Sequence, residues 1–286
     1  MSAERGRAAK GAERASGKLT NEQKTEMVRR YEAGESTIAL GKAFGITPKA
    51  VGDNVMRRGK KMRCLSTSHR RLTLDEAAFS EINERSAYWV GFIMADGGIN
   101  RNVLKVGLSD VDIAHLRKLR EFLKAGHTIT HRPGLPPKNG KASFTVNSDR
   151  IVADLARFGV VPNKSHTARV IGGLEHDRHF WRGVVDGDGS VRFNGYPKFR
   201  YPSFELVGSS AMMSQFSAFI ETACPGIALR VKPHKNIFRV TASGRTALAI
   251  LDTLYSGATV ALDRKAATAH EMLMGRMETD LLAKTA

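Results

Sequence analysis

The chain of 286 residues has few of the features that mark secreted, zinc-binding or membrane proteins. Its only cysteines, Cys64 and Cys224, show no Cys-x-x-Cys spacing, so neither a disulfide framework nor a zinc ribbon is indicated. No uninterrupted apolar stretch approaches the ~18 residues that a membrane helix needs, and the N-terminus lacks the apolar centre of a signal peptide. We therefore expect an intracellular protein of the cytoplasm or nucleoid, with no membrane partner.

Acidic residues are scarce relative to basic ones. The chain has 45 Lys and Arg against 28 Asp and Glu, a formal net charge of +17. Residues 1–72 hold 17 basic and 7 acidic residues, and residues 73–286 hold 28 and 21, so both parts are basic. Such an excess favours a polyanionic partner, bound through phosphate contacts that weaken as salt rises. Nucleic acid is the expected partner, and a merely solubilising basic surface is the alternative.

Two of the few aspartates lie in an unexpected place. The stretch FWRGVVDGDGSV, residues 180–191, places Asp186 and Asp188 directly after an apolar run. Its Asp-Gly-Asp-Gly core resembles the start of a calcium-binding loop, but positions six and twelve are Val191 and Pro197, where such a loop needs glycine and a carboxylate. A calcium loop is therefore excluded. A plain turn, which Asp-Gly pairs commonly form, remains the alternative to a functional carboxylate.

A second stretch repeats this pattern. YWVGFIMADGGI, residues 88–99, aligns Trp89 with Trp181 and Asp96 with Asp188, a spacing of 92 residues. The interval is the size of a domain and far exceeds the period of a solenoid repeat. After each copy, apolar alternation and helical spacing predict strand, strand, helix, strand, strand, helix. The sequence therefore predicts an α+β fold built from two pseudo-symmetric αββαββ units.

The N-terminal part predicts three short helices between Leu19 and Gly59. Thr20 and Gln23 form a capping-box pattern at the start, and a short glycine-containing turn precedes the last helix. This stretch resembles the C-terminal DNA-binding module of resolvase and invertase recombinases, a helix-turn-helix whose final helix enters the major groove. An ordinary three-helix unit with a basic face is the alternative. The candidate DNA contacts in the final helix are Lys49, Asp53, Asn54, Arg57 and Arg58.

Changes of pattern along the chain predict its division into domains. The first residues have almost nothing to bury, which predicts a disordered basic arm. A polar, basic stretch after the three helices predicts a linker. The predicted parts are the arm at 1–18, an all-α helix-turn-helix domain at 19–60, the linker at 61–75, and the two αββαββ domains at 76–170 and 171–286.

Small residues stand four positions apart in both repeated helices. Gly91 and Ala95 in the first copy, and Gly183 and Gly187 in the second, lie on one face of each helix. Such residues let two helix backbones approach closely. Glycines merely tolerated in a buried helix are the alternative, at a cost of ~1 kcal/mol each. The duplication favours a helix pair at the interface between the two domains.

A parallel helix pair would bring Asp96 and Asp188 side by side at the helix C-termini. Two like charges at the negative ends of helix dipoles are unfavourable, so we expect a compensating cation. Hard oxygen ligands next to a polyanion indicate Mg²⁺, held by these carboxylates together with phosphate and water. Such a centre can activate water and stabilise the leaving oxygen of a phosphodiester.

The repeated stretches also resemble a known family. WVGFIMADG at 89–97 and WRGVVDGDG at 181–189 are similar to the two signature motifs of monomeric LAGLIDADG homing endonucleases, over roughly residues 75–275. The resemblance implies two sheets that form a saddle over the major groove and Mg²⁺-dependent hydrolysis of both DNA strands. It implies that the catalytic acids are Asp96 and Asp188, at the eighth position of each motif.

The resemblance implies two further features of the site. A lysine near the end of each half would lie near the attacking water, here Lys164 and Lys265, although phosphate or surface contacts are an alternative for both. At the sixth motif position Met94 stands in the first copy, whereas the second keeps Asp186. Because that position is usually structural in the family, the departure implies asymmetry rather than inactivity.

Basic residues alternate with apolar ones on the predicted strands, as expected of a sheet with one face on a core and the other on DNA. A solvated outer face is the alternative for each of them. Two histidine pairs have loosely metal-like spacing without a further Cys or His cluster, so zinc is not indicated. The predicted DNA contacts are Lys105, Arg132, Lys141, Arg192, Lys198, Arg200, Arg230, Lys232 and Arg239.

The sequence as a whole predicts a sequence-specific, Mg²⁺-dependent endonuclease. We expect a monomer that makes double-strand breaks in a long pseudo-palindromic DNA target. The alternatives are a maturase that holds intron RNA on the same fold and a catalytically silent DNA-binding regulator. The two motif acids favour the nuclease over the regulator, and the helix-turn-helix favours it over the maturase.

Overall fold

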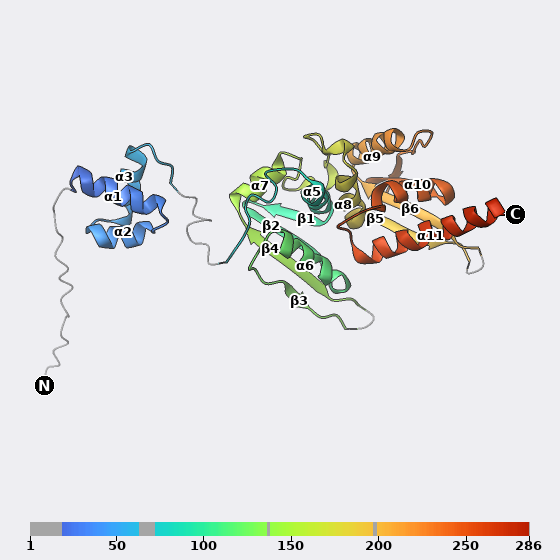
Figure 1. Ribbon diagram of the computed structural model, residues 1–286, viewed down its shortest axis with the longest axis horizontal. Helices are drawn as coiled ribbons and strands as arrows, with labels where there is room; N and C mark the ends of the chain where they lie inside the picture. Colours follow the sequence, from blue (N-terminus) through green and yellow to red (C-terminus); the bar gives the residue numbers. More distant parts are fainter. Residues whose placement is uncertain (1–18, 63–71, 136–137, 197–198, 286) are drawn as a thin grey trace. The chain divides into compact units, whose positions relative to one another are not determined.

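The computed structural model describes the whole chain except residues 1–18, 63–71, 136–137, 197–198 and 286, with side chains up to Gly275. It divides into two compact units, Met1–Arg70 and Arg71–Ala286 (Figure 1). The predicted arm and most of the predicted linker lie outside the described residues. No helix in the described part of the chain has the length and apolar character to cross a membrane.

The first unit contains three short helices with polar caps. They are α1 (Asn21–Glu32), α2 (Thr37–Phe44) and α3 (Pro48–Arg57). The capping box is confirmed, because the Gln23 amide donates to the Thr20 hydroxyl and the Thr20 amide donates to the Gln23 side chain. The helices pack around a small apolar core of their own: Met27, Val28, Tyr31, Leu40, Val51 and Val55.

The second unit repeats one series of elements, as predicted. The first copy consists of α5 (Glu84–Asp96), β1 (Gly97–Asn100), β2 (Val103–Ser109), α6 (Ile113–Phe122), β3 (Thr130–Arg132), β4 (Lys141–Asn147) and α7 (Asp149–Ala156). The second copy consists of α8 (Arg178–Asp188), β5 (Gly189–Asn194), β6 (Tyr201–Gly208), α9 (Ser210–Ala223), β7 (Lys232–His234), β8 (Ile237–Ser243) and α10 (Gly244–Tyr255). A further helix, α11 (Asp263–Thr285), follows and was not predicted.

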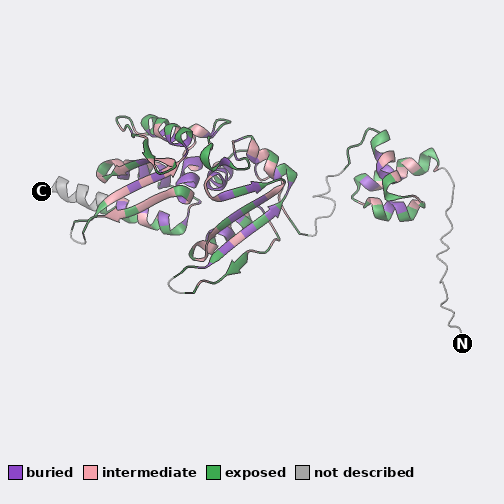
Figure 2. Cartoon of the chain, turned by 180° about the vertical axis from the view of Figure 1, so that it is seen from behind, coloured by how far each residue is buried: buried purple, intermediate pink, exposed green. Residues whose placement is uncertain are grey.

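Each copy forms a four-stranded antiparallel sheet. The strand orders are β1-β2-β4-β3 and β5-β6-β8-β7, so the two copies share one topology. Burial alternates along the strands: in β4, Ala142, Phe144 and Val146 are buried while the residues between them are more accessible. One face of each sheet therefore packs against helices and the other is open. Figure 2 shows the buried positions gathered on the strands and on the helices that cover them.

Helices α5 and α8 lie side by side between the two sheets (Figure 1). Each begins at a side-chain cap, Asn83 for α5 and Asp177 for α8. Most residues of both helices are buried on every side, because each helix packs against its own sheet and against the other helix. The cores of the two copies thereby join into one continuous apolar cluster.

Candidate active site

Small residues bring α5 and α8 into backbone contact. A Cβ atom added at Gly91 would lie 2.0 Å from a carbonyl oxygen of α8, and one at Gly183 would lie 2.1 Å from a carbonyl oxygen of α5. One turn further on, a Cβ at Gly187 would lie 2.3 Å from the Ala95 Cβ. No side chain fits at these glycines, so their positions fix the register of the two helices.

This register places the two motif acids on either side of the helix seam. Asp96 is the last residue of α5 and Asp188 the last of α8. A carboxylate oxygen of Asp96 lies 3.4 Å from where a Cβ would stand on Gly187, the residue before Asp188. Among the residues that the structure describes, no hydrogen-bond donor contacts either carboxylate. Their oxygens are therefore available to a ligand.

Burial raises the proton affinity of both acids. Asp188 keeps an exposed surface, but the surrounding protein and the Asp96 carboxylate raise its pKa from 3.8 to about 6. Burial also raises the pKa of Asp96, and the nearby Lys265 ammonium opposes that shift. The pair is thus a place where excess negative charge is poorly tolerated without a cation.

Two buried lysines supply positive charge at this point. The Lys164 ammonium donates to the carbonyl oxygen of Gly97, the first residue after α5. The Lys265 ammonium donates to four carbonyl oxygens at the end of α8, including those of Asp186 at 2.7 Å and Gly189 at 2.5 Å. Each lysine therefore binds the negative end of a motif helix.

The lysines change the electrostatic interpretation drawn from the sequence. The sequence predicted Mg²⁺ as the compensating cation and, from the family resemblance, Lys164 and Lys265 near the attacking water. In the structure both ammonium groups are buried and interact with the motif acids. Burial lowers the pKa of Lys265 to about 8, and it also lowers the pKa of Lys164, which the Asp188 and Asp96 carboxylates oppose. Lys265 donates to four backbone carbonyls, whereas Lys164 donates to one among the described residues.

The donor set of the seam fits Mg²⁺. The described residues contain no group of three or more His, Cys, Asp or Glu side chains that would enclose an ion. Two carboxylates with unoccupied oxygens are what Mg²⁺ takes from a protein when phosphate and water supply its remaining ligands. Asp96 and Asp188 are therefore the residues that would hold such an ion.

The open face of the first sheet forms a hollow that reaches the seam. Its volume is about 1000 Å³, and it is lined by Asp96, by the Asp112–Arg264 ion pair and by basic residues from β2, β3 and β4. Those basic residues are the predicted contacts Lys105, Arg132 and Lys141. The structure thus places an acid and three predicted phosphate contacts in one open groove.

The predicted contacts of the second sheet lie on or next to strands β5, β7 and β8. Arg192 lies exposed on β5, and Lys232 stands opposite Arg239 in the register of β7 and β8. The Arg239 guanidinium forms an ion pair with Glu205 at 3.5 Å. Arg230 is exposed just before β7. Among the described residues, Arg239 is therefore the one of these four contacts that forms an ion pair within the protein.

Two further predicted contacts of this half lie elsewhere. The Arg200 guanidinium stacks over the Phe193 ring at 4.2 Å and pairs with Glu271 of α11 at 3.0 Å. It therefore lies on the side of the sheet that faces the helices. Lys198 lies outside the described residues.

The predicted contacts of the first unit lie on α3 or, for Arg58, at its C-cap. Lys49 and Arg57 are exposed. The Asn54 amide donates to the Ala50 carbonyl at 2.7 Å within the helix, and the Arg58 guanidinium donates to the Thr25 hydroxyl of α1 at 2.9 Å. In this structure Asn54 and Arg58 thus make internal contacts.

The sixth motif position is built differently in the two copies. Asp186 is buried and accepts hydrogen bonds of 2.7 Å from the hydroxyls of Tyr88 and Tyr255 and from the Leu262 amide. Met94, its counterpart, lines a pocket of about 200 Å³ next to α9. The acid therefore joins α5, α8, α10 and the segment before α11, a structural role of the kind that the family resemblance implied for this position.

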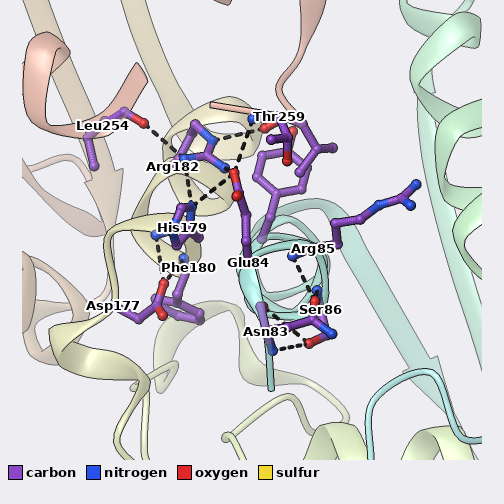
Figure 3. A network of polar contacts seen from close by, with 12 residues as sticks. Asn83, Glu84, Arg85, Ser86, Asp177, His179, Phe180, Arg182, Leu254 and Thr259 are labelled. Atoms are coloured by element: carbon purple, nitrogen blue, oxygen red, sulfur yellow. Dashed lines mark hydrogen bonds and ion pairs between the residues drawn. The ribbon is translucent and has the colours of Figure 1, made fainter. Parts of the chain in front are cut away.

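A second polar network joins the other ends of the motif helices (Figure 3). The Arg182 guanidinium is fully buried and donates to Glu84 at 3.2 Å and to the Leu254 carbonyl at 3.0 Å. Glu84, in the first turn of α5, also accepts from the Thr259 amide at 3.1 Å. The network holds α5 against the second copy at the end opposite to the acids. An arginine within the apolar motif was the only sequence signal for it.

No family model and no curated protein matches the chain. Solved structures are similar to it. The LAGLIDADG meganuclease I-AabMI bound to uncleaved DNA is 12% identical at a TM-score of 0.48, covering 71% of this chain and 92% of that one. The LAGLIDADG homing endonuclease I-GzeII in complex with its DNA target is 10% identical at a TM-score of 0.49, covering 70% and 92%. The N-terminal LAGLIDADG domain of DUF199/WhiA is 12% identical at a TM-score of 0.40, covering 68% and 94%.

Proposed function

We propose that the chain is a DNA endonuclease of the two-motif LAGLIDADG type, which cuts both strands of a specific duplex with Mg²⁺ and acts as a monomer. The observation that carries the proposal is the seam itself. One carboxylate from each copy stands at the end of a tightly packed helix pair, free of hydrogen-bond donors in the described structure, beside a groove with three basic residues. A phosphodiester bound in that groove would reach the acid at its end.

Each group at the seam has a distinct task in this proposal. Asp96 and Asp188 hold Mg²⁺, which would activate water and stabilise the leaving oxygen. Lys105, Arg132 and Lys141 bind backbone phosphates and set the position of the duplex. Lys265 fixes the end of α8 through four carbonyls. Lys164 donates to one carbonyl among the described residues and lines the same pocket as Asp188, so in this proposal it would use its remaining donors to contact a phosphate oxygen.

The three-helix unit would extend the contact with DNA. Its last helix presents Lys49 and Arg57 to solvent, and exposed basic residues of this kind bind phosphates without reading sequence. We propose that it acts as a helix-turn-helix that strengthens binding outside the cleaved site. Deleting residues 1–62 would then weaken binding and reduce its salt dependence while leaving the cut positions unchanged.

The test is cleavage of a randomised duplex library. The protein is incubated with the library and Mg²⁺, and the ends produced are sequenced, with EDTA and an Asp96→Asn/Asp188→Asn double variant as controls. We expect one family of breaks that both controls abolish. Specific binding without any break would instead identify a silent DNA-binding regulator, and binding restricted to structured RNA would identify a maturase.

A further inference from the structure

The backbone contact between α5 and α8 is the same in both directions. The first half, residues 72–172, carries α5, and the second half, residues 173–286, carries α8. A Cβ on Gly91 would meet the Phe180 carbonyl oxygen at 2.0 Å, and one on Gly183 would meet that of Tyr88 at 2.1 Å. The 92-residue repeat relates these two contacts to each other. The backbone contact therefore has two-fold symmetry and would serve equally for two first halves or two second halves.

One hydrogen bond across the seam breaks this symmetry. The Tyr88 hydroxyl donates to the Asp186 carboxylate at 2.7 Å, and both side chains are buried. The positions 92 residues away hold Phe180 and Met94, and no hydrogen bond forms there because the phenylalanine side chain has no polar atom. Two first halves on the same axis would set Tyr88 against Met94, and two second halves would set Asp186 against Phe180. Either homotypic seam would lose this hydrogen bond.

A buried ion pair breaks the symmetry at the other end of the helices (Figure 3). The Arg182 guanidinium is fully buried and donates to the Glu84 carboxylate at 3.2 Å. The positions 92 residues away hold Val90 and His176. Two first halves would bring together two Glu84 carboxylates and no guanidinium, and two second halves would bury two guanidiniums and no carboxylate. Because a buried charge without its partner is strongly destabilising, both homotypic seams are disfavoured.

A single methyl group adds a steric difference next to the motif acids. Ala95 and Gly187 are also 92 residues apart and face each other, since a Cβ on Gly187 would lie 2.3 Å from the Ala95 Cβ. Two first halves would therefore set alanine against alanine and clash. The next nearest atoms to that Cβ belong to Asp96 and are 3.4 Å away or more. The seam thus has room for one methyl group at this point and not for two.

We propose that the seam is a heterotypic recognition surface, on which each half accepts the other and rejects a second copy of itself. The backbone supplies a symmetric contact, and the side chains make one pairing favourable and two unfavourable, which is how a protein selects a partner. This inference goes beyond the proposed function and does not depend on cleavage. The residues that make the selection are three from each half: Glu84, Tyr88 and Ala95 with Arg182, Asp186 and Gly187.

The test lets the two halves choose their partners. A protease site is inserted between Gly172 and Gly173, which are exposed in the connection between the copies, and the folded chain is cut there. Both fragments are unfolded together in urea and refolded together, and native mass spectrometry counts the complexes. Random pairing would give a ratio of about 1:2:1. We expect at least about a hundredfold excess of the heterotypic complex over either homotypic one, because each of those lacks the buried ion pair.

A variant of the first half removes its two main obstacles to self-pairing. Ala95→Gly/Glu84→Gln abolishes the methyl clash and the uncompensated carboxylates, so pairs of first halves should increase at least about tenfold. The matched control is Glu81→Gln, an exposed carboxylate three residues before Glu84, which should leave the distribution unchanged. A wild-type ratio near the random one, fragments that do not rejoin, or no response to the double variant would overturn the proposal.

The intact chain tests the steric part separately. Gly187→Ala sets a second methyl group against Ala95, whereas Ala95→Gly/Gly187→Ala exchanges the two residues across the seam. We expect Gly187→Ala to lower the urea midpoint of unfolding and the exchange to recover most of that loss, because the remaining neighbours are at least 3.4 Å away. An exchange that recovers nothing would contradict the proposed complementarity. Loss of cleavage in a protein that still pairs heterotypically would count against the nuclease and not against this pairing.

Discussion

The two copies share one topology, but they carry different residues with different contacts at the sixth motif position. At the sixth motif position the second copy buries an aspartate that three donors bind, whereas the first places Met94 beside a pocket of about 200 Å³. At the eighth position the two copies agree, and both end in an aspartate next to a buried lysine. The copies therefore diverge where side chains only support the fold and remain alike where the chemistry is proposed.

The largest effect is expected at the seam that the copies share. Gly183→Ala would place a Cβ 2.1 Å from a backbone oxygen. Because backbone can yield only by separating the helices, we expect a loss of at least ~3 kcal/mol in the free energy of unfolding. Gly91→Ala should cost about as much. In Gly98→Ala the nearest atom is 3.9 Å away, so urea unfolding should show little change. A Gly183→Ala protein of wild-type stability would show that the helices are not in backbone contact.

The second-largest effect is a difference in stability between substitutions at the sixth motif position of the two copies. Asp186→Asn would turn an amide donor toward one of the donors that now bind the carboxylate, so we expect a loss of ~2–3 kcal/mol. Met94→Leu, at the matching position, should cost less than ~1.5 kcal/mol because the volume is conserved. Thermal unfolding of both variants measures the difference. Equal losses would mean that the two side chains contribute equally to the free energy of unfolding.

A smaller difference is expected between the two lysines. Lys265→Met leaves four carbonyl oxygens without their donor, whereas Lys164→Met leaves one. Unsatisfied buried carbonyls cost ~1–3 kcal/mol, so Lys265→Met should be the more destabilising. If Lys164 contacts substrate, its variant should lose cleavage while it keeps most of its stability. The reverse ranking in chemical denaturation would contradict the assignment of Lys265 as the main support of α8.

The smallest expected effect is the pH dependence of stability that the motif acids cause. Because the folded pKa of Asp188, about 6, lies above its ordinary value of 3.8, the folded state binds more protons between these values. Its contribution to stability therefore falls as pH rises from about 4 to about 6 in EDTA. Asp188→Asn removes this loss, so the variant should gain stability relative to the wild type over that range. Since Asp188 is partly exposed, the gain should be ~1 kcal/mol or less.

Adding Mg²⁺ sharpens this measurement. The ion should restore wild-type stability above pH 6 and leave the Asp96→Asn/Asp188→Asn protein unchanged. Asp96→Asn alone should show a weaker pH effect than the wild type, because it removes the carboxylate that helps to raise the pKa of Asp188. A difference between wild type and Asp188→Asn that does not vary with pH would contradict the raised pKa.

Much of the fold was predictable because the duplication is visible in the residues themselves. Trp89 and Trp181, and the small residues one turn apart, were sufficient to predict a repeated helix pair, and apolar alternation after each helix predicted the two αββαββ copies. The bounds of the strands followed from alternation, as in Val103–Ser109. Helix α11 was missed although Ala266, Ala269, Met272 and Leu273 recur at helical spacing on its inner face. Its contacts with β5 and α10 could not be read from the sequence.

The hydrogen bonds that hold the site residues in place could not be predicted, because they join residues that lie far apart in the sequence. Lys265 reaches carbonyls about 80 positions earlier, and Tyr88 reaches Asp186 across 98 positions. Arg200 seemed suited to DNA from its place next to a strand, but its side chain stacks toward α11. Strand alternation assigns a face only within the strand, and Arg200 lies just outside it.

The most direct test of the central claim is cleavage by single-acid variants on a duplex that the wild type binds. Asp96→Asn and Asp188→Asn each remove one carboxylate of the pair without changing the seam glycines. We expect each to bind within about threefold of the wild-type affinity and to lose double-strand cleavage with Mg²⁺ by at least about a thousandfold. Full cleavage by either variant, or no cleavage by the wild type on its bound site, would contradict a nuclease that takes one acid from each half.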